Sequence, residues 1–473
     1  MTDPLLLRDE LDQALAYAVR EATRYLGELD ESPVLPAGAS DAADALAGAL
    51  PEDGDGALAA LTELVEQGLG AATRSSGPRF FHFVTGGVTP AAQGADWLAS
   101  TLDQNAFSAV SSPLAVRLES VAIEWLLDLF RLPSSWGGVL TTGATTANFT
   151  ALAAARRWWA ERHGVDVDER GFEGLPAPPI FSSGYVHPSA TKALAMLGLG
   201  RGSVRVLTED AAGRLNTDSL ERELASLDGA PAILIGNAGD VNTGDFDPIE
   251  PMADLAERYG AWLHVDGAFG LFARLTPRAS GLATGVERAN SVISDGHKWL
   301  NVPYDCGFAF LRDPAPLHAT FGFSAAYLPG DELPGPEASR RARSLAVWTT
   351  LRAYGRSGYR AMVERHLDLA QRLAERVDAS PVLERLAEVP LNIVCFRFRP
   401  PGADESALDD LNARIGRTLL KDGRVYVGTT RYEGRVAFRP AIVNWRTTAA
   451  DVELIAAVVV ELGERELATA VRQ

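Results

Sequence analysis

The sequence has few cysteines, fewer basic than acidic residues, and no long apolar run. Only Cys306 and Cys395 occur in 473 residues, which excludes a disulfide framework and a cysteine-rich metal site. Acidic residues outnumber basic residues by 62 to 44, and the net charge of −18 would repel nucleic acid and anionic membranes. No apolar stretch reaches the roughly 20 residues that cross a bilayer, and the amino terminus has no basic start followed by an apolar core. We therefore predict a cytoplasmic protein with no metal and no nucleic-acid or membrane partner.

The composition is that of a globular protein with two or three structural units. Hydrophobic residues make up 47% and charged residues 22% of the chain. Residues 1–75 read as helices, over 5–25 and 58–69, joined by a Pro- and Gly-rich link that gives them no core of their own. Their apolar faces need another surface, such as a partner subunit. We predict an N-terminal helical dimerisation segment at 1–75, a large domain at 76–345 and a small α+β domain at 346–473.

The pattern in the large domain predicts an α/β fold with a mostly parallel sheet. Strand-like runs alternate with helical ones, an order typical of helices that flank parallel strands. A Pro- and Gly-rich stretch over 314–339 predicts a long loop. In the small domain we expect strands over 391–398, 424–427 and 435–439. The strand-like runs of the large domain are 203–207, 232–236, 262–266 and 292–295, and the helical runs are 219–227 and 251–259.

A lysine and an aspartate carry the chemistry. Lys298 lies between His297 and Trp299, an unusual place for an amine that normally stays among polar neighbours. Asp266 ends the apolar run Trp262 to Val265, as a carboxylate at a strand end would. Pyridoxal phosphate needs both groups, because the amine forms a Schiff base with its aldehyde and the carboxylate keeps its ring nitrogen protonated. We predict pyridoxal 5′-phosphate as the cofactor.

Two connections between a predicted strand and the helix that follows it are also suited to this cofactor. Residues 138–148 read as a strand, a turn of small residues and a helix start, where backbone N–H groups and threonine hydroxyls bind a phosphate or merely cap a helix. His187 follows a strand-like run, at the sheet edge where α/β folds bind ligands, and its ring could stack on the cofactor or be structural. Residues 77–90 are rich in aromatics and glycines and form either a pocket wall or a packed turn.

These residues together resemble the pyridoxal-phosphate-dependent group II decarboxylases, the family of aromatic-L-amino-acid, tyrosine, histidine and glutamate decarboxylases. The resemblance covers roughly residues 75–460. It rests on His-Val-Asp at 264–266, His187, His297-Lys298-Trp299, Asp305-Cys306 and the Arg-Arg-Ala-Arg-Ser segment that begins at Arg340.

The resemblance implies a fold-type I enzyme that acts as a homodimer with active sites at the subunit interface. It implies that Lys298 is the Schiff-base lysine, that Asp266 pairs with the pyridine nitrogen and that His187 stacks on the ring; these three are the catalytic candidates. The other implied cofactor contacts are Ala144, Thr145 and His297 at the phosphate, with Asn237 and Asn242 in a loop near the cofactor. The implied substrate contacts are Phe83, Thr85 and Tyr327.

The implied reaction is decarboxylation of an L-amino acid to an amine and carbon dioxide. Aromatic substrates are favoured because the loop at 77–90 offers three phenylalanines and only Arg79 as a cation. The chain departs from the family where a loop tyrosine usually protonates Cα, since residues 331–339 contain no Tyr, Phe or His. Tyr327, His187 or water remain candidates for that proton. An aldehyde-forming decarboxylase, a pyridoxal-dependent carbon–carbon lyase and a non-catalytic cofactor-binding homologue are the alternatives.

Overall fold

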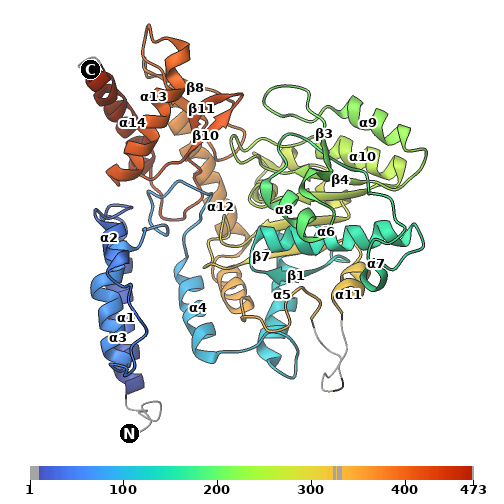
Figure 1. The fold of residues 1–473 in the computed structure, drawn as a ribbon, viewed down its shortest axis with the longest axis horizontal. Coiled ribbons are helices and arrows are strands. Elements are labelled where there is room, and N and C mark those ends of the chain that lie inside the picture. The colour runs from blue at the N-terminus through green and yellow to red at the C-terminus, as the bar shows by residue number, and fades with distance from the viewer. Residues whose placement is uncertain (1–9, 323–325, 327–332, 471–473) are drawn as a thin grey trace.

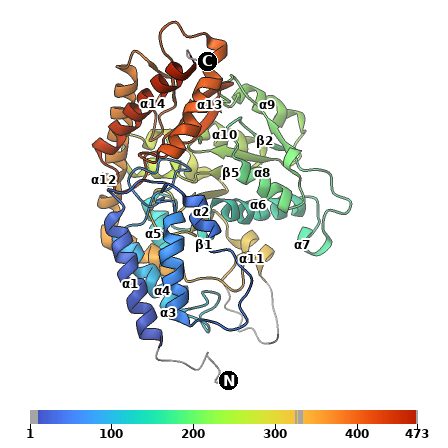
Figure 2. The same cartoon turned by 60° about the vertical axis from the view of Figure 1, so that its left-hand side comes forward.

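The N-terminal part of the chain forms three helices without a buried core. The computed structural model describes residues 10–322, 326 and 333–470. No side chain of these three helices is buried, and α1 and α3 lie side by side outside the main body (Figures 1 and 2). The helices predicted over 5–25 and 58–69 are confirmed where the structure describes them, residues 5–9 lying outside the described part, although α3 becomes a π turn after Glu63. The three are α1 (Glu10–Glu28), α2 (Ala39–Asp44) and α3 (Ala57–Glu63).

A seven-stranded sheet forms the centre of the large domain, in the order β1-β7-β6-β5-β4-β2-β3. Strand β7 is antiparallel to both neighbours, whereas the other six strands run in one direction. The predicted mostly parallel sheet is confirmed, and the carboxyl ends of six strands meet at one edge. The strands are β1 (Gly137–Thr141), β2 (Ile180–Ser182), β3 (Val204–Val206), β4 (Ile233–Asn237), β5 (Trp262–Asp266), β6 (Ser291–Asp295) and β7 (Gly307–Leu311).

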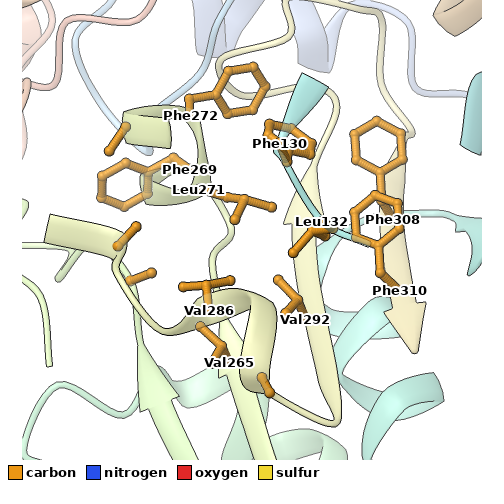
Figure 3. Close-up of a cluster of buried hydrophobic side chains, with 14 of the residues drawn as sticks. Phe130, Leu132, Val265, Phe269, Leu271, Phe272, Val286, Val292, Phe308 and Phe310 are labelled. Atoms are coloured by element: carbon orange, nitrogen blue, oxygen red, sulfur yellow. The ribbon is translucent and has the colours of Figure 1, made fainter. Parts of the chain in front are cut away.

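Helices cover both faces of this sheet. Because successive side chains of a strand point to opposite faces, Val292 packs in one core and its neighbour Ile293 in the other. Figure 3 shows part of the first core, which contains Val292 beside Leu132 and Val286, and also the rings of Phe130 and Phe272. The helices around the sheet are α4 (Pro90–Leu102), α5 (Pro113–Leu129), α6 (Ala144–Glu161), α7 (Val167–Arg170), α8 (Pro188–Met196), α9 (Thr217–Ser226), α10 (Ile249–Tyr259) and α11 (Ala315–Phe321).

The C-terminal part builds a smaller unit around an antiparallel sheet, in the order β10-β11-β9-β8. Its own core lies between this sheet and its helices (Figure 1). Helix α12 joins the two units, because Val347 and Leu351 near its start belong to the core of the large sheet, whereas Leu373 and Val377 near its end belong to the small core. The elements are α12 (Ser344–Asp378), β8 (Leu383–Arg385), β9 (Phe396–Phe398), α13 (Glu405–Asp422), β10 (Thr429–Tyr432), β11 (Arg435–Phe438) and α14 (Ala449–Ala470).

Local patterns misplaced several element bounds. Helix α11 occupies part of the stretch that we expected to be one long loop, because Pro314 and Pro316 allow a helix start as well as a loop. The strand expected over 424–427 is not a strand, and β10 forms a few residues later. Tyr327 lies outside the described residues. Within the described part of the chain, no helix is long and apolar enough to cross a membrane.

Candidate active site

The sequence-predicted residues come together at the carboxyl edge of the large sheet. Asp266 ends β5, its register partner Asn237 ends β4, and Lys298 follows β6 after a short turn. His187 follows β2 and caps the start of α8, where its side chain accepts a bond from the N–H group of Ser189. Helix α6 begins at Ala144, directly after β1. Parallel strands bring their carboxyl ends to one edge, which is where α/β sheets bind ligands.

Asp266 is held in a buried chain of hydrogen bonds. Its Oδ2 atom accepts from Nδ2 of Asn148 at 2.9 Å, and its Oδ1 atom accepts from the N–H group of Ala268 at 3.1 Å. The Oδ1 atom of Asn148 lies 2.8 Å from Nε2 of His264. The Nδ1 atom of His264 lies 2.9 Å from Oγ of Ser291. Burial lowers the pKa of His264 to about 4, so this ring is neutral at neutral pH. Neutral donors therefore orient a buried carboxylate toward the site.

Lys298 is paired with Asp295, a carboxylate for which the sequence alone predicted no role. The Nζ atom of Lys298 lies 3.3 Å from Oδ2 of Asp295, and Nε2 of His297 lies 3.5 Å from the same oxygen. The other oxygen accepts the N–H group of Ala144 at 2.6 Å, so Asp295 also caps α6. Asp295 ends β6, the same strand-end signal that identified Asp266, and that signal could have found it.

The expected phosphate site lies at the start of α6. Gly143 has a φ of +149°, and a Cβ atom there would lie 3.0 Å from Cε1 of His297. Thr145 follows in the first turn of α6 and is half-buried. The small turn thus lets the His297 ring and the Asp295 carboxylate approach the positive end of the helix.

Four charged side chains of the site act on the pKa of His187. Its Nδ1 atom lies 2.7 Å from Oγ of Ser189. Burial lowers its pKa; Asp266 raises it, Lys298 and Arg439 lower it, and Asp295 raises it slightly. Each of these four side chains is therefore within electrostatic reach of the imidazole. Arg439 comes from the small domain, directly after β11, and was not selected from the sequence as a site residue.

The two loop asparagines are bonded to other protein groups. The Nδ2 atom of Asn237 donates to Oδ2 of Asp247 at 2.8 Å, and burial raises the pKa of Asp247 to about 6. The Oδ1 atom of Asn242 accepts from Oγ1 of Thr430 in β10 at 2.7 Å. Asn237 thus lies beside Asp266 at the sheet edge, whereas the side chain of Asn242 joins that loop to the small domain.

The aromatic loop borders the lysine. The N–H group of Gly86 donates to the carbonyl of His297 at 3.2 Å. Phe83, at a φ of 56°, keeps 60% of its surface exposed, while Thr85 is buried and its Oγ1 lies 3.0 Å from the hydroxyl of Tyr304. Tyr304 carries no sequence signal that would have selected it. The predicted substrate residues Phe83 and Thr85 therefore lie on a loop packed against the segment that carries Lys298.

The Arg-Arg-Ala-Arg-Ser segment, which precedes and begins α12, forms ion pairs with residues near the site. Arg340 forms a buried ion pair with Glu119 of α5 at 3.0 Å, and its Nη1 also donates to the carbonyl of Leu140 in β1. Arg343 pairs with Asp305 at 2.7 Å and donates to the carbonyl of the same residue. The segment therefore braces β1 and the chain that follows Lys298.

These residues fit pyridoxal 5′-phosphate. A buried carboxylate with neutral hydrogen-bond partners, an amine, a histidine held by a serine, and a helix start after a glycine turn are the groups that its ring nitrogen, aldehyde, ring face and phosphate require. Sheet and site together define a fold-type I enzyme dependent on pyridoxal phosphate.

Comparison with known proteins identifies the family. The pyridoxal-dependent decarboxylase conserved domain matches residues 45–399, so the chain belongs to that family. It is 27% identical to the aromatic-L-amino-acid decarboxylase of Bacillus atrophaeus, over 96% of this chain and 95% of the relative. It is 32% identical to the L-2,4-diaminobutyrate decarboxylase of Rhizobium meliloti, over 84% of this chain and 80% of the relative.

A solved structure confirms the fold. Oryza sativa TDC with PLP and tryptamine superposes with a TM-score of 0.88 and 25% identity, over 98% of this chain and 99% of that chain. The predicted fold class, cofactor and reaction class are thus confirmed: the chain is an amino-acid decarboxylase that depends on pyridoxal phosphate, a carboxy-lyase.

Proposed function

We propose that the chain decarboxylates an aromatic L-amino acid to the amine and carbon dioxide. The observation that carries this proposal is the aromatic loop: Phe80 stacks on Tyr426 at 5.1 Å, His82 lies 3.6 Å from Phe83 between ring centroids, and the Phe83 ring is exposed beside the Lys298 segment. An exposed ring on a packed aromatic base suits an aromatic side chain, because offset or tilted ring pairs contribute about 0.5–1.5 kcal/mol beyond burial.

The residues of the site take the following proposed roles. Lys298 would hold the cofactor aldehyde, Asp266 its ring nitrogen and His187 its ring face. The phosphate would lie against Ala144, Thr145 and His297. When bound, the cofactor supplies an electron-accepting ring. Asp266 keeps a proton at the ring nitrogen, and the Asn148–His264 pair keeps the Asp266 carboxylate in place.

We further propose a homodimer with 1–75 as the dimerisation segment, 76–345 as the cofactor domain and 346–473 as the small domain. Exposed apolar side chains on α1 support it, since Leu11, Leu15 and Val19 keep 48–62% of their surface exposed. Exposed Leu98 and Leu102 on α4 offer a second apolar surface. Sedimentation of the wild type against Leu15→Glu tests this, because a charge in the interface would shift the mass toward the monomer.

The two cysteines are free and buried, which fits the reducing cytoplasm that we propose as the location.

One experiment tests the reaction and its substrate. The pyridoxal-phosphate-loaded protein is incubated with aromatic, acidic and basic L-amino acids, and carbon dioxide, amine, aldehyde and oxygen uptake are measured together. Amine and carbon dioxide in equal amounts from aromatic substrates alone support the proposal. Turnover of acidic or diamino acids alone would contradict the aromatic preference, and aldehyde with oxygen uptake would indicate the aldehyde-forming alternative.

Lys298→Ala tests the assignment of the site. It should abolish both the visible absorbance of the cofactor and carbon dioxide release. The matched control is Lys192→Ala, which removes an exposed lysine on α8 and should retain both.

A further inference from the structure

Tyr304 is an exposed ring on a backbone that is fixed from several sides. It keeps 61% of its surface exposed, yet its ring stacks on the His297 imidazole at 4.2 Å between centroids and 25° between planes. Its neighbour Asp305 is held by Arg343 at 2.7 Å. The N–H group of Cys306 donates to Nδ1 of His297, and the Cys306 carbonyl accepts the N–H group of Gly296 at 3.0 Å. A ring that is accessible to solvent but held by this many contacts is more typical of a functional residue than of an ordinary surface residue.

The Tyr304 hydroxyl lies at the junction between the aromatic loop and Lys298. It is 3.0 Å from Oγ1 of Thr85. The next residue, Gly86, lies so close to the lysine that a Cβ atom there would be 1.7 Å from the Lys298 carbonyl oxygen. Asp295, whose carboxylate is 3.3 Å from Nζ of Lys298, acts electrostatically on the same phenol. The hydroxyl therefore lies where the loop of the predicted substrate residues contacts the backbone segment that carries Lys298.

The phenol keeps its proton at neutral pH. Although 61% of the residue is exposed, desolvation around its hydroxyl raises the pKa of Tyr304 above its ordinary value of 10; the bond with Thr85 lowers it in part, and Asp295 raises it again. His187 differs, because burial lowers its pKa and its Nδ1 atom is already bonded to Ser189, so it is a neutral ring with one nitrogen engaged. Of the two, Tyr304 is the better proton donor.

Decarboxylation leaves Cα with an electron pair that must receive a proton. We propose that Tyr304 donates the proton that replaces the carboxyl group on the substrate Cα. The bond between Cα and the carboxyl carbon breaks and carbon dioxide leaves; the O–H bond of Tyr304 breaks as the new Cα–H bond forms. The resulting phenolate takes a proton from water, and Thr85 holds the oxygen in place. This role rests on the proposed function.

Tyr304→Phe tests the role, because it removes one oxygen and keeps the ring that stacks on His297. The variant should bind pyridoxal phosphate with wild-type affinity and absorbance, since the phenol is not among the proposed cofactor contacts. Amine formation should fall by about 10²–10⁴-fold, the range that a positioned general acid contributes. Without oxygen, mixing with substrate should produce a long-wavelength absorbance that decays more slowly than in the wild type.

Thr85→Val is a second variant that keeps the phenol but removes its hydrogen-bond partner, and it should give a smaller loss of amine formation. The matched control is Tyr259→Phe at the end of α10, which is at the opposite edge of the sheet from the site. It should behave as the wild type in every readout.

The outcomes separate this role from the proposed function. Carbon dioxide release by the wild type with an unchanged rate of amine formation in Tyr304→Phe would overturn the role of Tyr304 alone. The role of Tyr304 would also be overturned if amine formation were lost in Tyr327→Phe but not in Tyr304→Phe, because that result would identify Tyr327 as the proton donor. A wild type that releases no carbon dioxide from any amino acid would overturn the proposed function, and the proton-donor role with it.

Discussion

Oδ2 of Asp295 lies 3.3 Å from Nζ of Lys298, while Oδ1 of the same carboxylate accepts the first N–H group of α6 at 2.6 Å. The carboxylate thus occupies the anion-binding end of the helix and pairs with the amine of the site. A cofactor phosphate at the same helix end would meet a negative charge there.

This relationship predicts that Asp295→Asn binds the cofactor more tightly. The amide keeps an oxygen for the N–H group of Ala144, but removes the charge that repels the phosphate and competes for the lysine. We expect the dissociation constant of pyridoxal phosphate to fall by about tenfold, equivalent to about 1.4 kcal/mol. Absorbance titration of the cofactor-free protein measures it. Titration with pyridoxal, which lacks the phosphate, is the control and should change less; equal changes for both would show that Asp295 does not act on the phosphate.

Asn148 and His264 should act on Asp266 as one unit. Asn148→Ala leaves Oδ2 of Asp266 and Nε2 of His264 without their described partner, which costs about 1–3 kcal/mol for a buried polar group. His264→Ala removes the far end of the same chain. Urea unfolding of both single variants and of the double variant should show that the double variant loses less than the sum of the two. Additive losses would contradict a shared network.

Buried histidines should make the fold less stable in mild acid. Burial lowers the pKa of His82 and His264 to about 4 and that of His366 to about 3, from 6.5. Between pH 6.5 and about 4 the unfolded chain binds more protons on these rings than the folded chain, so the free energy of unfolding falls as the pH falls. Asp247 opposes this trend, because its pKa is raised from 3.8 to about 6 and the folded chain binds its proton first.

Five histidines with lowered pKa values outnumber the three carboxyl groups with raised pKa values, Glu119, Asp240 and Asp247, so urea unfolding at about pH 5 should give a lower free energy than at about pH 7.5. His366→Gln should reduce the difference between the two pH values, even though it also weakens the bond that His366 accepts from Trp299. A difference that does not change in this variant would show that His366 is not a source of the pH dependence.

Gly86 should tolerate no side chain. A Cβ atom at this position would lie 1.7 Å from the carbonyl oxygen of Lys298, and neither backbone can move without displacing the lysine. Gly86→Ala should therefore lose the cofactor absorbance. Gly94→Ala in α4 is the matched control, because no atom lies within 4 Å of its added Cβ, and it should raise the free energy of unfolding by up to about 1 kcal/mol. A fully loaded Gly86→Ala protein would contradict the close approach.

The sequence predicted the parts of the site that follow a local rule. Asp266 is predictable because a charged group at the end of an apolar strand lies at the edge where parallel strands end, and Lys298 is predictable because an amine between two rings is unusual. The strand-end rule applies equally to Asp295, which ends β6 three residues before the lysine.

Other contacts depend on pairings between distant segments. Asn148 lies inside a helix and meets Asp266 across 118 residues, and Thr85 meets Tyr304 across 219. No periodicity encodes such pairs. Strand β7 lies between β1 and β6 in the sheet. The alternation of strands and helices along the sequence does not predict the order of the strands in the sheet. The bound of the third N-terminal helix and the shift of β10 show that local propensity also misjudges where an element ends.

Helix α12 couples the thermal unfolding of the two units. The helix is interrupted at Gly355, whose φ of 58° and ψ of −176° are not helical. The part after Gly355 still contributes Met362 and Val363 to the core of the large sheet and Leu373 and Val377 to the small core, so neither unit can lose its packing without withdrawing part of this helix from the other. We therefore expect a single calorimetric transition for both units. A fragment that begins after Gly355 would retain the small sheet yet expose Met362 and Val363 to water, and would be prone to aggregate.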